Sequence, residues 1–143
     1  MSLFNPSRDQ VRDFFCQTWQ KHSERSILTP MESIAARWMV EHPEYHDVLG
    51  HAQRAKELEY APEQGQTNPF LHLSMHMSLT EQVQANQPIG IQDIAHHLRD
   101  RLGSEHEAHH RMMECLGQVI WQAQRAQAPP DMNAYLEALK QLL

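Results

Sequence analysis

Residues 68–86 read NPFLHLSMHMSLTEQVQAN, and this stretch decides the fold class. Asn68 followed by Pro69 is a typical helix start, because asparagine caps the first turn and proline fits its geometry. The first half of the stretch is apolar on most sides, which is typical of a helix that other helices surround. The pattern therefore predicts a central α-helix, which residues 87–90 (QPIG) end.

Helix signals of the same kind lie on both sides of this stretch. Ser7 can cap a first helix, and Thr29 with Pro30 and Glu32 forms a capping box for a second. A further capping box begins at Ser104 and opens the longest predicted helix. The other predicted elements are a short helix at 43–49, a weaker helical stretch at 51–58, a loop at 60–68, a helix from 91 that Gly103 ends, and a last helix from 132.

The predicted elements are all helical, and no segment shows the two-residue alternation of a β-strand. Four long amphipathic helices with shorter ones predict an all-α fold. We expect a four-helix-bundle-like, up-and-down arrangement with additional short helices. A chain of 143 residues fits a single helical domain over residues 1–143.

Composition and charge exclude several classes of function. The formal net charge is −6, which argues against a nucleic-acid binder, because phosphate contact needs a basic face. No apolar run approaches the roughly 18 residues that a membrane span needs. The first residues lack the basic region and apolar stretch of a signal peptide. We therefore expect a cytoplasmic protein that contacts neither nucleic acid nor membrane.

No common catalytic motif stands out. The five glycines occur singly, without a phosphate-binding loop, and no Gly-x-Ser-x-Gly motif occurs. Two cysteines, Cys16 and Cys115, do not make a disulfide framework. A Cys–His nucleophile is the alternative to weigh, but both thiols lie among apolar positions and are expected to be structural.

Histidine spacing gives the sharpest functional hypothesis. The chain has 11 histidines, and three pairs of them are separated by four residues. Four residues is just over one helical turn, so a pair can direct two imidazoles to the same side. Two such imidazoles make half of a tetrahedral zinc site or part of a di-iron site. The pairs are His42 and His46, His72 and His76, and His106 and His110.

The pair in the central predicted helix is expected to face the core. His72 and His76 follow one line with Leu79 along that helix. A buried imidazole must be hydrogen-bonded or coordinated, since an unsatisfied polar group costs about 1–3 kcal/mol. Metal coordination and two core histidines satisfied by carboxylates or backbone are both compatible with this pattern.

The longest predicted helix carries a second set of candidates. His106, His110 and Glu114 follow one another every four residues along one side. The alternative is a solvated polar first turn, because the segment HEAHHR is rich in charge. His109 lies on the more apolar side of the helix, so we expect either that His109 is buried or that the helix is buried over a wide arc.

The third pair has a different geometry, because Pro43 interrupts it. A residue before proline is disfavoured in helical geometry, so the four-residue spacing of His42 and His46 does not place both imidazoles on one side of a helix. We expect His46 either to contribute a ligand alone or to be a surface histidine in a turn. No role is assigned to His22, His51, His96 and His97.

Five segments resemble an uncharacterised family of small bacterial all-helical proteins, classified as a domain of unknown function. They are FNPSRDQVRDFF (4–15), HPEYH (42–46), NPFLHLSMHMSLTEQ (68–82), HxxxHxMMECLG (106–117) and WQAQR (121–125). The resemblance implies a helical bundle and a cytosolic bacterial protein, and it brings no activity. At His109 it leads us to expect an acidic residue in relatives. The positions carried over are His42, His46, Asn68, His72, His76, Glu81, Gln82, His106, His110 and Glu114.

Two functions follow as expectations. The first is a transition-metal site, for zinc or iron, with ligands His72, His76, His106 and His110. Glu114 would be a carboxylate ligand or an outer-shell partner, and His46 a fifth ligand. The second is a non-catalytic interaction or scaffold homo-oligomer whose histidines form a buried hydrogen-bond network. A homo-oligomer is expected in either case, because the three tryptophans and the wide apolar arc of the NPFLH helix offer more apolar surface than one small bundle needs.

Overall fold

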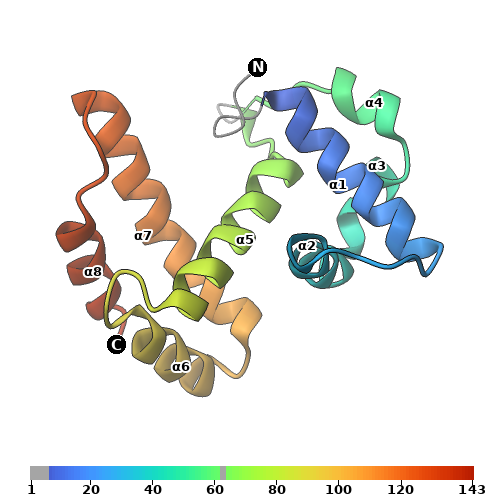
Figure 1. Cartoon of the computed structure of the whole chain (residues 1–143). Helices are drawn as coiled ribbons and strands as arrows, with labels where there is room; N and C mark the ends of the chain where they lie inside the picture. The colour runs from blue at the N-terminus through green and yellow to red at the C-terminus, as the bar shows by residue number, and fades with distance from the viewer. Residues whose placement is uncertain (1–6, 62–63) are drawn as a thin grey trace. The chain divides into compact units, whose positions relative to one another are not determined.

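The computed structural model describes residues 7–61 and 64–143 (Figure 1). Every regular element in these ranges is helical, which confirms the all-α class. No helix within them has both the length and the apolar composition of a transmembrane span. The elements are α1 (Arg8–Ser23), α2 (Pro30–Val40), the 3-10 helix η1 (Pro43–Tyr45), α3 (His46–Leu49), α4 (Ala52–Glu57), α5 (Pro69–Ala85), α6 (Ile91–Leu102), α7 (Glu105–Ala126) and α8 (Met132–Lys140).

The chain divides into two compact units, Met1–Met77 and Ser78–Leu143, and the division falls inside α5. The expectation of a single helical domain over residues 1–143, arranged as an up-and-down bundle, stays a prediction. Parts of two predicted segments, residues 4–6 of the first motif and 62–63 of the loop, lie outside the described residues.

The predicted helix starts are confirmed by the hydrogen bonds of their capping side chains. Ser7 and Thr29 each form a capping box with the third residue of α1 and of α2. Asn68 Oδ1 accepts hydrogen bonds from two N–H groups in the first turn of α5, at 3.0 and 3.2 Å. Ser104 Oγ accepts from the N–H of Glu107 in α7 at 3.1 Å, so this helix start has a cap, but among the described residues it lacks the return bond of the predicted capping box. Each cap satisfies an otherwise unpaired donor and typically contributes about 1 kcal/mol.

The predicted helix ends are confirmed as well. α2 ends at Val40, and His42 leaves helical geometry before Pro43, with φ −127° and ψ 66°. Gly103 ends α6 with φ 96°, a left-handed conformation that favours glycine. The break after α2 places His42 just beyond the helix end.

An apolar and aromatic core holds the unit Met1–Met77 together. In this unit α1 packs against α2 and α4 (Figure 1). Trp38 of α2 is completely buried at the centre, and the start of α5 contributes buried side chains to the same core. Burial of such side chains contributes roughly 1.5–3 kcal/mol each before the entropy cost of ordering them. Large members of the core are Phe15, Trp38, Met39, Leu49, Phe70 and Leu73.

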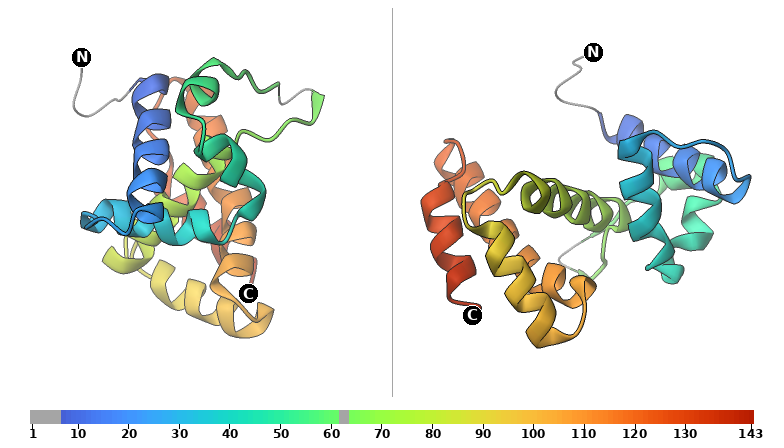
Figure 2. Two further views of the ribbon diagram at one scale, coloured as in Figure 1. Left: turned by 90° about the vertical axis from the view of Figure 1, so that its right-hand side faces the viewer. Right: turned by 60° about the horizontal axis from the view of Figure 1, so that its bottom comes forward.

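In the unit Ser78–Leu143, α6, α7 and α8 pack on one another (Figure 2). Tyr135 of α8 is completely buried, and its hydroxyl donates to Oε1 of Gln82 in α5 at 2.8 Å. Burial raises the pKa of Tyr135 well above its ordinary range, so the hydroxyl keeps its proton. This part-buried hydrogen bond joins α8 to the second half of α5.

Glu32 joins the start of α2 to α1 and makes stability depend on pH. Its Oε2 accepts from Nζ of Lys21 at 2.8 Å, and its Oε1 accepts from the N–H of Thr29 at 2.9 Å. The hydrogen bond from Lys21 and that from the Thr29 backbone lower the pKa of Glu32 below its usual 4.5. A carboxylate with a lowered pKa stabilises the fold above its unfolded-state pKa, and this stability is lost as pH falls through the folded pKa.

We therefore expect Glu32→Gln to flatten the acid side of the stability profile. The urea midpoint of the wild type should fall more steeply than that of the variant between about pH 5 and about pH 3. The comparison needs urea unfolding curves for both proteins at several pH values. Equal slopes would show that Glu32 carries no such linkage.

Candidate metal centre

His42 lies just beyond α2 and is 2% exposed. Its Nδ1 is 2.6 Å from the carbonyl oxygen of Trp38, one turn earlier. Because a carbonyl oxygen only accepts hydrogen bonds, Nδ1 carries the proton and the lone pair of the neutral ring lies on Nε2. A backbone bond of this kind is what fixes the tautomer and the ring orientation of metal-binding histidines.

The first turns of α5 bring two more imidazoles against His42 within the unit Met1–Met77. The centroid distances are 4.9 Å from His42 to His72, 4.9 Å from His42 to His76 and 4.8 Å from His72 to His76. His76 is completely buried and stacks on the Trp38 ring at 4.0 Å, with 13° between the planes. The predicted inward direction is therefore confirmed for His76, while His72 is half-buried.

The start of α7 holds the other histidine pair, in the unit Ser78–Leu143. The ring centroids of His106 and His110 are 4.4 Å apart with 78° between the planes, and both residues are half-buried. His109 is 1% exposed, which agrees with the first of the two alternatives for it, and its Nε2 lies 3.8 Å from Oε1 of Glu105. The first turns of α7 are thus not a fully solvated polar segment.

Two histidines of each unit offer a ring nitrogen that a metal ion could bind. They are His42 and His76 in Met1–Met77, and His106 and His110 in Ser78–Leu143. Imidazole nitrogen is a ligand that zinc, iron and copper accept in proteins. Four nitrogen ligands are the number that a tetrahedral zinc ion takes. Three members of this set, all except His42, are ligands that the sequence predicts.

The remaining predicted ligands are not members of this set. His46 donates from Nε2 to the carbonyl oxygen of Met39 at 2.8 Å, and its ring stacks on Trp19 with centroids 4.2 Å apart. Glu114 is exposed on α7. His72 contacts two members of the set through its ring edge. The ligand roles of these three residues stay predictions.

Sequence reasoning missed His42. Pro43 was expected to break the helical spacing of His42 and His46, and the backbone at His42 confirms this break. Of the two residues, His46 was predicted as the ligand. The useful signal was the distance back to Trp38. A histidine four residues after a helical residue, at the helix end, can return its Nδ1–H to that residue's carbonyl and direct its other nitrogen elsewhere.

The two cysteines do not support a Cys–His nucleophile. Cys16 is buried in the core of the first unit, and Cys115 is half-buried on α7. Burial raises the pKa of both thiols, and neighbouring carboxylates raise it further. A raised pKa disfavours the thiolate, which is the reactive form, so both side chains fit a structural role.

Comparison with known protein families gave a match to one family model. The model of a family described as Domain of unknown function (DUF1841) matches residues 7–141, a range that includes every candidate ligand. Comparisons with curated proteins and with solved structures gave no significant match. The family description carries no activity, and membership of a fold family does not by itself determine one.

Proposed function

We propose that this chain, which belongs to the DUF1841 family, is a metal-binding protein whose ligands are His42, His76, His106 and His110. Zinc is the first candidate ion and iron the second, because both accept imidazole nitrogen. The observation that carries the proposal is the 2.6 Å hydrogen bond from His42 Nδ1 to the Trp38 carbonyl. It leaves the lone pair on Nε2, the atom that would bind the ion.

Trp38 supports the proposal further, because it holds two of the proposed ligands at once. Its carbonyl orients His42, and its indole ring stacks on His76. Both ligands are buried, and neither has to be drawn from solvent into the core. Ligands that are positioned before the ion arrives lose little conformational freedom on binding, which favours affinity.

α7 supplies the other two proposed ligands from one face of a long helix. His106 and His110 are one helical turn apart, so their nitrogens leave the helix on the same side. The hydrogen bond from the Glu107 N–H to Ser104 Oγ fixes the first turn, in which His106 lies. A capped turn frays less, which keeps this pair in a defined geometry.

The number of ligands indicates what the ion does. A zinc ion with four protein ligands has no open position, which is typical of structural sites, whereas catalytic sites keep one position for water or substrate. The proposed ion therefore stabilises the folded chain, since binding to the folded state alone shifts the folding equilibrium. The residues named here imply no reaction.

Metal analysis of untagged protein tests the proposal. Protein from cells grown with zinc and iron supplied should contain about one equivalent of metal per chain. Dialysis against a strong chelator should lower the melting temperature, and added zinc should restore it. Less than about a tenth of an equivalent, with no effect of the chelator, would contradict the proposal.

A second candidate function is a non-catalytic scaffold homo-oligomer whose histidines form a hydrogen-bond network. The hydrogen bond from His46 to the Met39 carbonyl, at 2.8 Å, and the half-exposed ring of Trp121 favour it. In this case a chelator leaves the melting temperature unchanged. The oligomer should instead become smaller near about pH 6, as imidazoles gain protons.

A further inference from the structure

A cavity of about 430 Å³ lies beside α1 in the unit Met1–Met77. This volume falls in the range of small-molecule sites in proteins, roughly 300–1,000 Å³. Among the described residues that line the cavity, none is a candidate metal ligand. Its polar lining residues are Arg8, Arg12, Glu59, Tyr60, Asn68 and Ser74.

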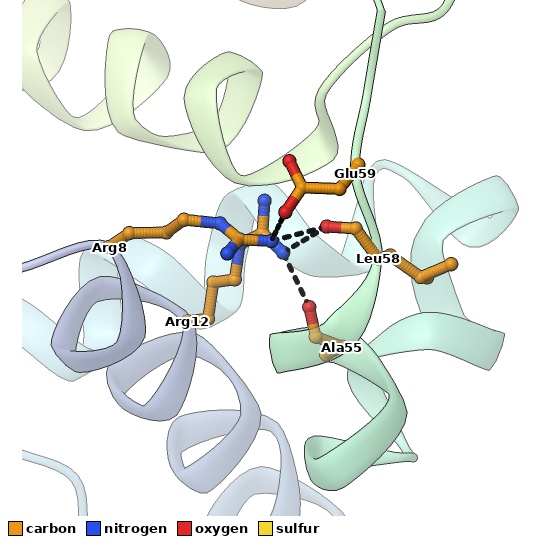
Figure 3. Close-up of polar contacts among 5 residues, drawn as sticks. All are labelled: Arg8, Arg12, Ala55, Leu58 and Glu59. Atoms are coloured by element: carbon orange, nitrogen blue, oxygen red, sulfur yellow. Dashed lines mark hydrogen bonds and ion pairs between the residues drawn. The ribbon is translucent and has the colours of Figure 1, made fainter.

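Arg12 places a buried positive charge in the cavity wall. It is 3% exposed, and no carboxylate of residues 7–61 and 64–143 forms an ion pair with it. Both of its hydrogen bonds leave from Nη1, to the carbonyl oxygens of Ala55 at 2.7 Å and Leu58 at 2.6 Å (Figure 3). Its Cζ also lies 5.5 Å from the centroid of the Tyr60 ring and 5.0 Å from that of the Phe70 ring. Carbonyls and ring faces carry no formal charge, so this buried guanidinium keeps a charge that an anion can neutralise.

Arg8, one helical turn earlier on α1, brings a second guanidinium to the same place. Its Nη2 donates to the Leu58 carbonyl that Arg12 also uses (Figure 3). Burial lowers the pKa of Arg12, and the charge of Arg8 lowers it further. Two like charges at one carbonyl oxygen repel each other, and an anion that contacts both guanidinium groups would remove this repulsion.

The anion already present on Arg8 indicates the chemistry that fits. Oε1 of Glu59 lies 3.2 Å from Nη2 of Arg8, although the Glu59 side chain is 84% exposed and can move away (Figure 3). Val11 and Phe70 contribute apolar lining, which suits an organic body better than an inorganic ion. We propose that this cavity binds a small organic carboxylate, which replaces Glu59 on Arg8 and also neutralises Arg12.

A titration with 4-fluorobenzoate, followed by ¹⁹F NMR on the full chain, tests this site. The uncharged 4-fluorobenzamide has nearly the same shape and serves as the matched probe. The carboxylate should bind at least about tenfold more tightly than the amide, because a hydrogen bond to a charged group is worth that factor. Equal affinity for the two probes would overturn the proposal.

Three exposed side chains provide the variants. Arg8→Gln should weaken 4-fluorobenzoate binding by about tenfold. Glu59→Gln should strengthen it by about two- to fivefold, the value of the exposed ion pair that the ligand displaces. Arg54 pairs with Asp47 at 3.1 Å and does not line the cavity, so Arg54→Gln should leave the affinity unchanged. An unchanged affinity in Arg8→Gln, or an equal loss in Arg54→Gln, would contradict the assignment.

Discussion

Trp38→Ala should lower the free energy of unfolding by about 3–5 kcal/mol, the usual cost of deleting a buried large aromatic side chain. Trp38 is completely buried and is the largest fully buried side chain of the described residues. Its removal leaves a cavity in the core of the first unit and takes away the ring on which His76 stacks. Equilibrium unfolding in urea measures the loss.

The matched control makes the same substitution at the surface. Trp121 on α7 is 50% exposed, and its ring has the guanidinium of Arg125 4.8 Å from its centroid. Trp121→Ala should cost less than about 1 kcal/mol, because it removes only partial burial and a surface cation–π contact. Similar losses in the two variants would contradict the central place of Trp38 in the core.

His76→Ala should lower the affinity for zinc by at least about a hundredfold. Loss of an outer-shell partner alone costs about 10–100-fold, and loss of a ligand removes a bond to the ion itself. Competition with a chromophoric chelator measures the affinity. His76 is completely buried, so the half-buried His110 provides a second variant that disturbs the core less, and His110→Ala should show a similar loss.

Another histidine serves as the control for these two variants. His97 is exposed on α6 and does not belong to the four-histidine set. His97→Ala should keep wild-type zinc affinity, because it removes an imidazole without removing a proposed ligand. If His76→Ala and His110→Ala also kept wild-type affinity, neither residue would be a ligand.

Local sequence signals predicted the helices because the interactions that start and end a helix are local. The Thr29 capping box is closed by Glu32, three residues away. Likewise, the end of α2 follows from Pro43 and the end of α6 from the left-handed Gly103. The division of the chain inside α5 has no such signal, because contacts between distant segments determine it.

Three of the four proposed metal ligands were predictable because they lie inside helices, where local spacing determines direction. They are His76, His106 and His110. His42 lies beyond a helix end, and a hydrogen bond to the backbone decides where its nitrogens point. The cavity at Arg12 could not be predicted from the sequence either, because Leu58, to which Arg12 donates, lies 46 residues further along the chain.

X-ray absorption at the zinc edge, on the zinc-loaded full chain, tests the central claim most directly, because it identifies the atoms bound to the ion. We expect four imidazole nitrogens at about 2.0–2.1 Å from zinc. In His42→Ala we expect one imidazole fewer. A spectrum dominated by oxygen ligands, or one that is identical in His42→Ala, would contradict the assignment of these histidines to a metal site.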